Sequence, residues 1–156
     1  MHVMVKNSHT PNLPDATDVA MCTCANLRKV TRAVTQAFDE ALRPAGLRST
    51  QFTLLAVLSA KGDAPLTRVA ETLGMDRTTL TRNLKPLVQR GLISLEQGDD
   101  QRVRNVSLTD DGSQAFEDAL PHWQLAQKRI SGNLGHERWS GFLNDMSAAI
   151  SAVESG

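Results

Sequence analysis

Six basic or hydroxyl side chains lie close together near the middle of the 156-residue chain. They are Arg77, Thr78, Thr79, Thr81, Arg82 and Lys85. An arginine can hold guanine through paired hydrogen bonds, a threonine can bond a base or touch a thymine methyl group, and a lysine can meet a phosphate. The stretch from Arg77 to Leu95 also carries no carboxylate. We therefore interpret these side chains as a helix face that contacts double-stranded DNA.

The residues around this face predict two short helices joined by a tight turn. The first spans 66 to 73, with Thr67 as its expected N-terminal cap and Gly74 as its end. The second runs from Arg77 to about residue 90, capped by Asp76. The pattern is typical of a helix-turn-helix, whose second helix enters the major groove with its N-terminal residues on the bases. Backbone N–H groups near Thr67 and Asp76 are candidate phosphate donors.

A β-hairpin is expected after the second helix. Residues 92–96 and 103–108 have strand character, and the residues between them are rich in turn formers. Arg102 and Arg104 are two positions apart, so a strand would direct both to the same side. An arginine on such a wing can enter the adjacent minor groove, and we expect Asp100 to brace Arg102.

Long helices are predicted on both sides of this region. We divide the chain into a tail at 1–16, a dimerisation helix with its connection at 17–48, a DNA-binding lobe at 49–108 and C-terminal dimerisation helices at 109–156. Ser49 is the expected cap of a helix that is apolar nearly all round and therefore buried. The predicted fold class is mainly α with a small hairpin wing, a winged helix-turn-helix. The apolar faces of the flanking helices favour a homodimer.

Three runs of residues carry a resemblance to a known family. They are Asp100-x-Arg102, Val106-x-Leu108-Thr109-x-x-Gly112 and Leu87-Val88-x-Arg90-Gly91-Leu92-Ile93. Together they resemble the signature of the MarR family, and the likeness extends over nearly the whole chain. The resemblance implies a dimer with interlocked terminal helices and one winged helix per subunit. It further implies a pseudo-palindromic operator and, usually, a repressor that a small ligand or thiol oxidation releases, with the DNA contacts on the residues named above.

Two cysteines suggest one form of control. Cys22 and Cys24 are expected near the start of the first helix, where the helix N-terminus and the positive charge of Arg28 favour a reactive thiol. The hydroperoxide-sensing branch of the MarR family has a reactive cysteine in this helix, and Cys24 is the better positional match. That branch also holds its thiolate with tyrosines, whereas this chain has none. The alternative is that both cysteines are small buried apolar residues.

A small-molecule inducer, such as an aromatic acid, is the other expected form of control. A pocket between the dimer helices and the DNA-binding lobe, as in the aromatic-acid-responsive members of the family, would hold it. The candidate lining residues are Arg28, Arg48, Gln51 and Trp123. Each of them could equally lie on the surface or in the core.

Several classes of protein are disfavoured by composition and motif. No G-x-G-x-x-G, Walker motif or Cys–His arrangement suggests an enzyme or a cofactor, and the four histidines lack the spacing of metal ligands. The first twenty residues lack the apolar core of a signal peptide, and no apolar run approaches the roughly 18 residues of a membrane helix. We therefore expect a cytoplasmic protein. A winged helix that binds another protein remains the alternative, because 17 basic and 17 acidic residues make the chain neutral overall.

Overall fold

The computed structural model describes residues 20–98 and 104–155, and the chain divides into two compact units. The first unit ends at Thr35, and the second begins at Gln36. Helix α2 (Thr23–Leu42) runs from one into the other. The predicted helix start at residue 17 lies outside the described residues. Within them, the continuous helix begins at Thr23, so the prediction of a helix through Cys22 was wrong.

Asn26 explains why the chain departs from a helix just before Thr23. Its side-chain amide donates hydrogen bonds to the carbonyl oxygens of Ala20 and Cys22, at 2.9 and 3.0 Å. Asparagine side chains offer the backbone such partners in place of a helical ladder. Cys22 therefore precedes α2, and Cys24 is the second residue of the helix.

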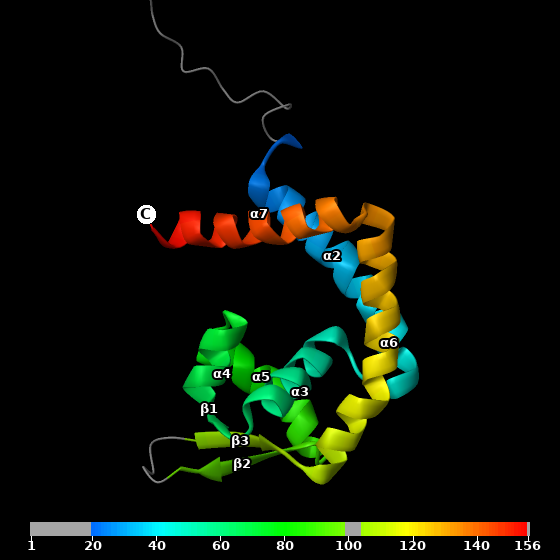
Figure 1. Cartoon of the computed structure of the whole chain (residues 1–156). Helices are drawn as coiled ribbons and strands as arrows, with labels where there is room; N and C mark the ends of the chain where they lie inside the picture. The colour runs from blue at the N-terminus through cyan, green and yellow to red at the C-terminus, as the bar shows by residue number, and fades with distance from the viewer. Residues whose placement is uncertain (1–19, 99–103, 156) are drawn as a thin grey trace, which may run out of the picture. The chain divides into compact units, whose positions relative to one another are not determined.

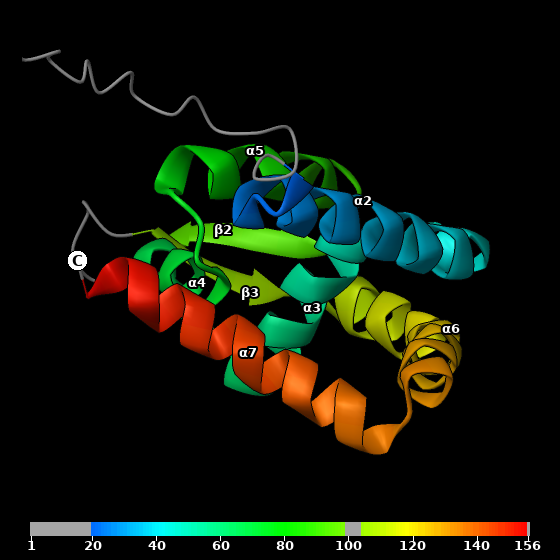
Figure 2. The same ribbon diagram turned by 90° about the horizontal axis from the view of Figure 1, so that it is seen from above.

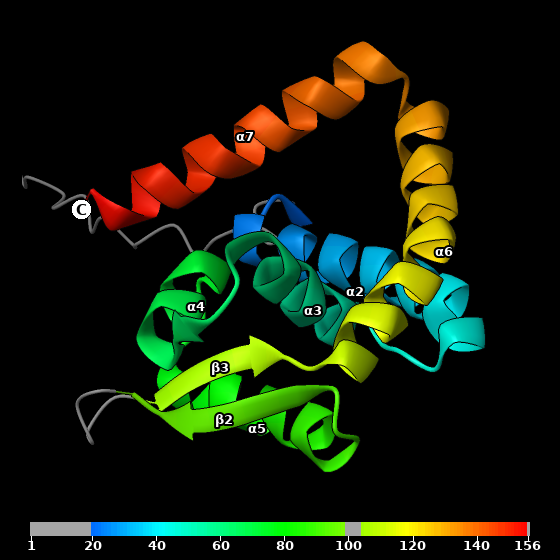
Figure 3. The ribbon, with the colours of Figure 1, turned by 60° about the horizontal axis from the view of Figure 1, so that its bottom comes forward.

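The second unit carries the remaining elements in a mainly helical arrangement with one small sheet (Figure 1). After α2 come η1 (Arg43–Ala45), α3 (Ser49–Lys61), β1 (Ala64–Pro65), α4 (Leu66–Leu73), α5 (Arg77–Gln89), β2 (Ile93–Gln97), β3 (Arg104–Leu108), α6 (Asp110–Leu134) and α7 (His136–Glu154). Helices α6 and α7 are separate, with a sharp bend at Gly135 (Figure 3). This architecture confirms the predicted fold class, a winged helix-turn-helix.

The helix ends show where local sequence decides the structure. Gly74 ends α4 in the left-handed conformation, with φ of 60°, as predicted. Thr109 caps α6 by accepting the backbone N–H of Gly112 at 3.0 Å. The prediction that Thr67 caps α4 was wrong, because Pro65 occupies the cap and Thr67 is already the second helical residue. Proline has a preset φ and no N–H group to satisfy, so it suits the start of a helix.

The expected cap of α3 was also wrong. Arg48 is the cap, and its backbone N–H donates to Oε1 of Gln51 at 3.0 Å. Ser49 is the first helical residue, and its N–H donates to Oδ1 of Asp39 at 2.7 Å. A carboxylate from the end of α2 thus takes the role that local sequence gave to the serine.

The sheet is antiparallel with the order β1-β3-β2, and Figure 2 shows β2 and β3 side by side. Strands β2 and β3 form the predicted hairpin, with Ile93 opposite Leu108 and Gln97 opposite Arg104. Ala64 and Pro65, which precede the first helix of the helix-turn-helix, form β1 beside Val106 and Asn105. A strand of two residues has no periodicity, so its pairing with a distant partner leaves no local signal.

The core is built around α3, which contacts α5, α6 and β3. Its Phe52 stacks on Phe116 and Trp123 of α6, with ring centroids 5.3 and 5.7 Å apart. Trp123 also stacks on Phe38 from the last turns of α2, at 6.3 Å. The side chains that are buried almost completely are Leu42, Leu54, Leu55, Leu58, Val69, Leu80, Leu84, Leu87 and Val106. These contacts pack the helix-turn-helix and the β2–β3 hairpin against one shared hydrophobic core.

Candidate nucleic-acid interface

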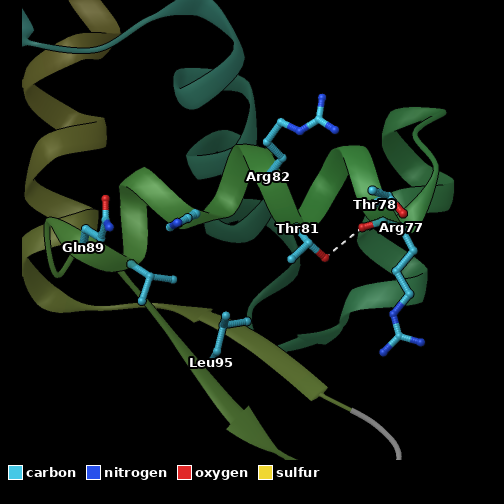
Figure 4. A pocket seen from close by; sticks show the side chains of 8 residues that line it. Arg77, Thr78, Thr81, Arg82, Gln89 and Leu95 are labelled. Carbon is cyan, nitrogen blue, oxygen red and sulfur yellow. Dashed lines mark hydrogen bonds between the residues drawn. The ribbon is translucent and has the colours of Figure 1, made fainter.

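An open groove of about 640 Å³ runs along α5 and is closed on one side by β2 (Figure 4). Its lining residues are Arg77, Thr78, Thr81, Arg82, Lys85, Val88, Gln89 and Leu95. Five of the six side chains that the sequence singled out are therefore brought together. Each of these five is exposed.

The helix period separates this groove from the core. Leu80, Leu84 and Leu87 recur at four- and three-residue steps and are at most 1% exposed. Burying them against α3 and the sheet turns the basic and hydroxyl residues of α5 outward. Within the described residues, no carboxylate forms a salt bridge with Arg77 or Arg82. Their guanidinium groups extend from α5 in different directions (Figure 4).

Asp76 caps α5, as predicted. Its carboxylate accepts the Thr79 backbone N–H at 2.8 Å and the Thr79 hydroxyl at 2.7 Å. The hydroxyl hydrogen bond first, and then those from backbone N–H groups, hold the pKa of Asp76 below its usual value. Because this pKa is lower in the folded protein than in the unfolded one, the cap stabilises the fold at neutral pH. That contribution is lost as the pH falls through the lowered pKa.

This cap changes the roles expected of Thr79 and Asp76. Thr79 is half-buried, its hydroxyl is bonded to Asp76, and it does not line the groove. The carboxylate also occupies the positive end of the helix, where a phosphate would otherwise be attracted. The structure therefore places both residues in the cap that starts α5.

Thr81 keeps a place in the groove with a restricted chemistry. Its hydroxyl donates to the carbonyl oxygen of Arg77 at 2.8 Å (Figure 4). A hydroxyl has a single hydrogen to donate, so the side chain presents lone pairs and a methyl group to the groove. Such a surface suits an amino group or a thymine methyl group on a base edge.

Two further predicted contacts, Thr67 and Arg104, do not line the groove. Thr67 is exposed on α4 and is not among the lining residues. Arg104 is exposed at the start of β3, opposite Gln97. Arg102 and Asp100 fall in 99–103, outside the described residues.

Two apolar groove residues were missed by reasoning from sequence. Val88 has the apolar character of a core position but is 37% exposed. Leu95 was treated only as part of a strand, and it forms the β2 wall of the groove. An apolar residue in a helix or strand normally signals the core, so neither position carried a distinguishing pattern.

A second hollow of about 350 Å³, lined by Lys61, Asp63, Ala64, Pro65 and Arg68, was not anticipated either.

The candidate control residues are distributed over both units. Cys22, Cys24 and Arg28 lie in the first unit and are exposed in the single chain. In the second unit Arg48 and Gln51 form the start of α3, while Trp123 belongs to the aromatic stack. Neither of the two hollows described above includes any of these residues.

The described residues contain neither a candidate metal site nor a candidate membrane span. No group of three or more His, Cys, Asp or Glu side chains could hold a metal ion there. In that part of the chain, no helix is both long and apolar enough to cross a bilayer.

Comparison with known proteins identifies the family. The MarR family model matches residues 45–102. The transcriptional regulator MosR of M. tuberculosis, solved in complex with DNA, is 36% identical, with a TM-score of 0.80 over 86% of this chain and 97% of that one. The HTH-type transcriptional regulator YwoH of Bacillus subtilis is 28% identical over 92 residues, which are 59% of this chain and 67% of that protein.

The regulator PcaV of Streptomyces coelicolor, solved with its natural ligand, shares the fold. Its TM-score is 0.81 at 20% identity, over 90% of this chain and 99% of that one. The identity to MosR extends over nearly all of that regulator, and the matched segment contains the helix-turn-helix described above. The chain belongs to the MarR family of winged helix-turn-helix transcriptional regulators.

Proposed function

We propose that this transcriptional regulator binds a pseudo-palindromic DNA operator as a homodimer and acts as a repressor. The observation that carries the proposal is the groove along α5, which gathers five predicted contact residues on one exposed face. MosR, with 36% identity, has been solved bound to DNA. A protein with this role acts by binding and release, not by catalysis, and in a bacterium it acts in the cytoplasm.

The groove suggests how the operator is read. Arg77, Thr78 and Thr81 lie on the N-terminal half of α5, the part of a recognition helix that reaches base edges. Arg82 and Lys85 follow and are suited to the phosphates that flank those bases. Arg104, with Arg102, would extend the contact along the wing to the neighbouring minor groove, and Thr67 would meet the backbone from α4.

A homodimer is supported by apolar side chains that the isolated chain leaves exposed. Among the described residues they are Met21, Leu27, Val30, Val88, Leu125, Leu143, Ile150 and Val153. All except Val88, which lines the groove, lie in the flanking segments, 17–48 and 109–156, that we assign to dimerisation, while 49–108 forms the DNA-binding lobe. Pairing these segments about a two-fold axis would place two α5 helices about 34 Å apart, one turn of DNA.

The proposed contact face is tested by removing its two cations. The Arg82→Ala, Lys85→Ala double variant should bind an operator, selected from random DNA, more weakly than the wild type. The slope of log affinity against log salt should fall by about 0.9 for each lost phosphate contact. Fluorescence anisotropy at several salt concentrations measures both quantities.

Lys128→Ala, Arg129→Ala is the matched control, because it removes a neighbouring exposed pair from α6. This variant should keep the wild-type salt slope. An unchanged slope in the Arg82, Lys85 variant would disprove the assigned contact face. A wild-type protein that binds another protein and no DNA would favour the interaction-module alternative.

For release, we propose a small-molecule inducer, as PcaV was solved with a natural ligand. An aromatic acid is the class we would screen first, and Arg28, Arg48, Gln51 and Trp123 are the positions to vary. Inducers should raise the dissociation constant for the operator. Substituting a true pocket residue should weaken this response and leave ligand-free DNA binding intact.

The second candidate signal is thiol oxidation, favoured by the exposure of both cysteines and by the position of Cys22 outside α2. A hydroperoxide would transfer one oxygen to the Cys24 or Cys22 thiolate, forming a sulfenic acid and leaving the corresponding alcohol after protonation. Operator binding by the wild type should then fall on treatment, while Cys24→Ser and Cys22→Ser identify the responding thiol. Identical binding with and without hydroperoxide would eliminate this signal.

A further inference from the structure

Arg90 belongs to the basic stretch of the sequence, but its side chain is directed away from the groove. It occupies the C-terminal cap of α5, and its Nη1 donates to the carbonyl oxygen of Gly46 at 2.9 Å. Gly46 ends η1 with φ of 67°, a left-handed conformation that favours glycine. A methyl group at Gly46 would lie 3.7 Å from Nη2 of Arg90, so the two residues are in close contact. Arg90 thus joins the end of α5 to the connection between α2 and α3.

A second attachment holds the same end of α5 to the start of α6. The hydroxyl of Thr109 donates to the carbonyl oxygen of Gly91 at 2.6 Å. The backbone N–H of Thr109 donates to the carbonyl oxygen of Leu92 at 3.2 Å. One turn further along α6, Gly112 lies against the carbonyl group of Leu92 so closely that a side chain would overlap it. The residues immediately after α5 are therefore fixed to α6.

We propose that Arg90 is a positioning residue that sets the direction of α5 relative to the dimerisation helices. The inference rests on the proposed function, because it concerns how two α5 helices reach one operator. The Gly46 carbonyl lies beyond the end of α2, and Thr109 caps α6, so both attachments join α5 to the segments assigned to dimerisation. A dimer held by those segments would therefore fix the spacing of its two α5 helices through the attachments at Arg90 and Thr109.

The length of α5 turns a small tilt at Arg90 into a large displacement at the N-terminal end of the helix. Thirteen helical steps from Arg77 to Arg90 correspond to about 20 Å, so a tilt of about 5° at Arg90 moves the reading end by roughly 2 Å. A displacement of that size breaks the alignment of side chains with base edges, which depends on hydrogen bonds of about 3 Å. Arg90 does not line the groove, so its effect on DNA would be indirect.

The experiment compares Arg90→Met with Arg82→Met, two changes of the same chemistry on one helix. Each variant and the wild type is titrated against the selected operator and against operators whose half-sites are one base pair closer or farther apart. Arg90→Met should weaken binding at the native spacing by about tenfold, the scale of a hydrogen bond to a charged group. It should keep the wild-type salt slope and lose much of its preference for the native spacing.

Arg82→Met should show the opposite pattern, a lower salt slope with the spacing preference retained. Arg90→Lys keeps a cationic donor that reaches a carbonyl, so it should recover part of the spacing preference. It also provides the decisive comparison if Arg90→Met does not fold.

Two results would overturn the inference while the proposed function stands. One is an Arg90→Met variant with wild-type affinity and spacing preference. The other is an Arg90→Met variant with the reduced salt slope of Arg82→Met, which would make Arg90 a phosphate contact. A wild-type protein that binds no DNA, or binds it without any spacing preference, would instead remove the proposed function on which the inference rests.

Discussion

At the level of single residues, adjacent positions of similar chemistry have different tasks. Thr78 and Thr81 line the groove, whereas Thr79 donates its hydroxyl to Asp76 and completes the start of α5. The Thr109-x-x-Gly112 part of the MarR signature has a mechanical explanation. Thr109 caps α6 and bonds to Gly91, and the absence of a side chain at Gly112 lets α6 lie against Leu92. A sequence signature near the proposed DNA-contacting residues thus serves the packing beneath them.

Gly112→Ala should be strongly destabilising, because its methyl group would overlap the carbonyl of Leu92, and backbone cannot move aside as a side chain can. We expect a loss of about 3 kcal/mol in the free energy of unfolding, the upper range for overpacking. Urea denaturation at fixed protein concentration measures it. Gly132→Ala lies in the same helix with nothing within 4 Å of the new methyl group. It should be neutral or stabilising by up to about 1 kcal/mol. Equal effects of the two substitutions would refute the close packing.

At the level of elements, α5 carries core residues on one face and the proposed binding residues on another. Leu84 is 1% exposed in the core, and the next residue, Lys85, is exposed in the groove. Neighbouring residues on a helix point about 100° apart, so they belong to different faces. Changes at these two positions should therefore be distinguishable in two independent measurements.

Leu84→Ala should reduce the free energy of unfolding by about 2–5 kcal/mol, the usual range for a truncated core leucine. Lys85→Ala should alter that free energy by less than about 0.5 kcal/mol, as at other surface positions. It should lower the salt slope of operator binding, whereas folded Leu84→Ala should keep that slope. Denaturation curves paired with anisotropy titrations test both. A strongly destabilising Lys85→Ala would contradict the two-faced description of α5.

Those features of the elements that depend on nearby residues were predictable from sequence. Asp76 caps α5 through a bond to a residue three positions ahead, and Gly74 ends α4 by its own conformation. The bond from Arg90 to Gly46 joins residues far apart in the chain, and β1 exists only because β3 lies beside it. Leu95 reaches the groove only because β2 packs against α5. Such features depend on tertiary packing, which no local pattern encodes.

At the level of the whole molecule, α7 carries a stripe of exposed apolar side chains that one chain does not cover. Leu143, Ile150 and Val153 are 39%, 59% and 82% exposed. At about 100° per residue they fall on one side of the helix, whereas Ala148 falls on the other. Isolated exposed apolar residues are ordinary, but a stripe along a helix favours a partner surface.

Ile150→Glu should therefore weaken the proposed dimer. Burying an uncompensated carboxylate costs about 3 kcal/mol or more, which raises the dimer dissociation constant more than about a hundredfold. Ala148→Glu adds the same charge on the opposite side and should leave association unchanged. Sedimentation velocity over a concentration series compares the two. If Ile150→Glu remains as dimeric as the wild type, this stripe is not part of the subunit interface.

Strand β1 has a consequence for the solubility of the molecule. The open edge of a sheet is a template on which another chain can add a strand, a common start of aggregation. β1 covers one side of β3 with only two residues, and the second of them is Pro65, which has no N–H group to offer. A proline at that edge interrupts any further strand addition. This edge of the sheet is thus protected from self-association, while the wing keeps the surface that we propose contacts DNA.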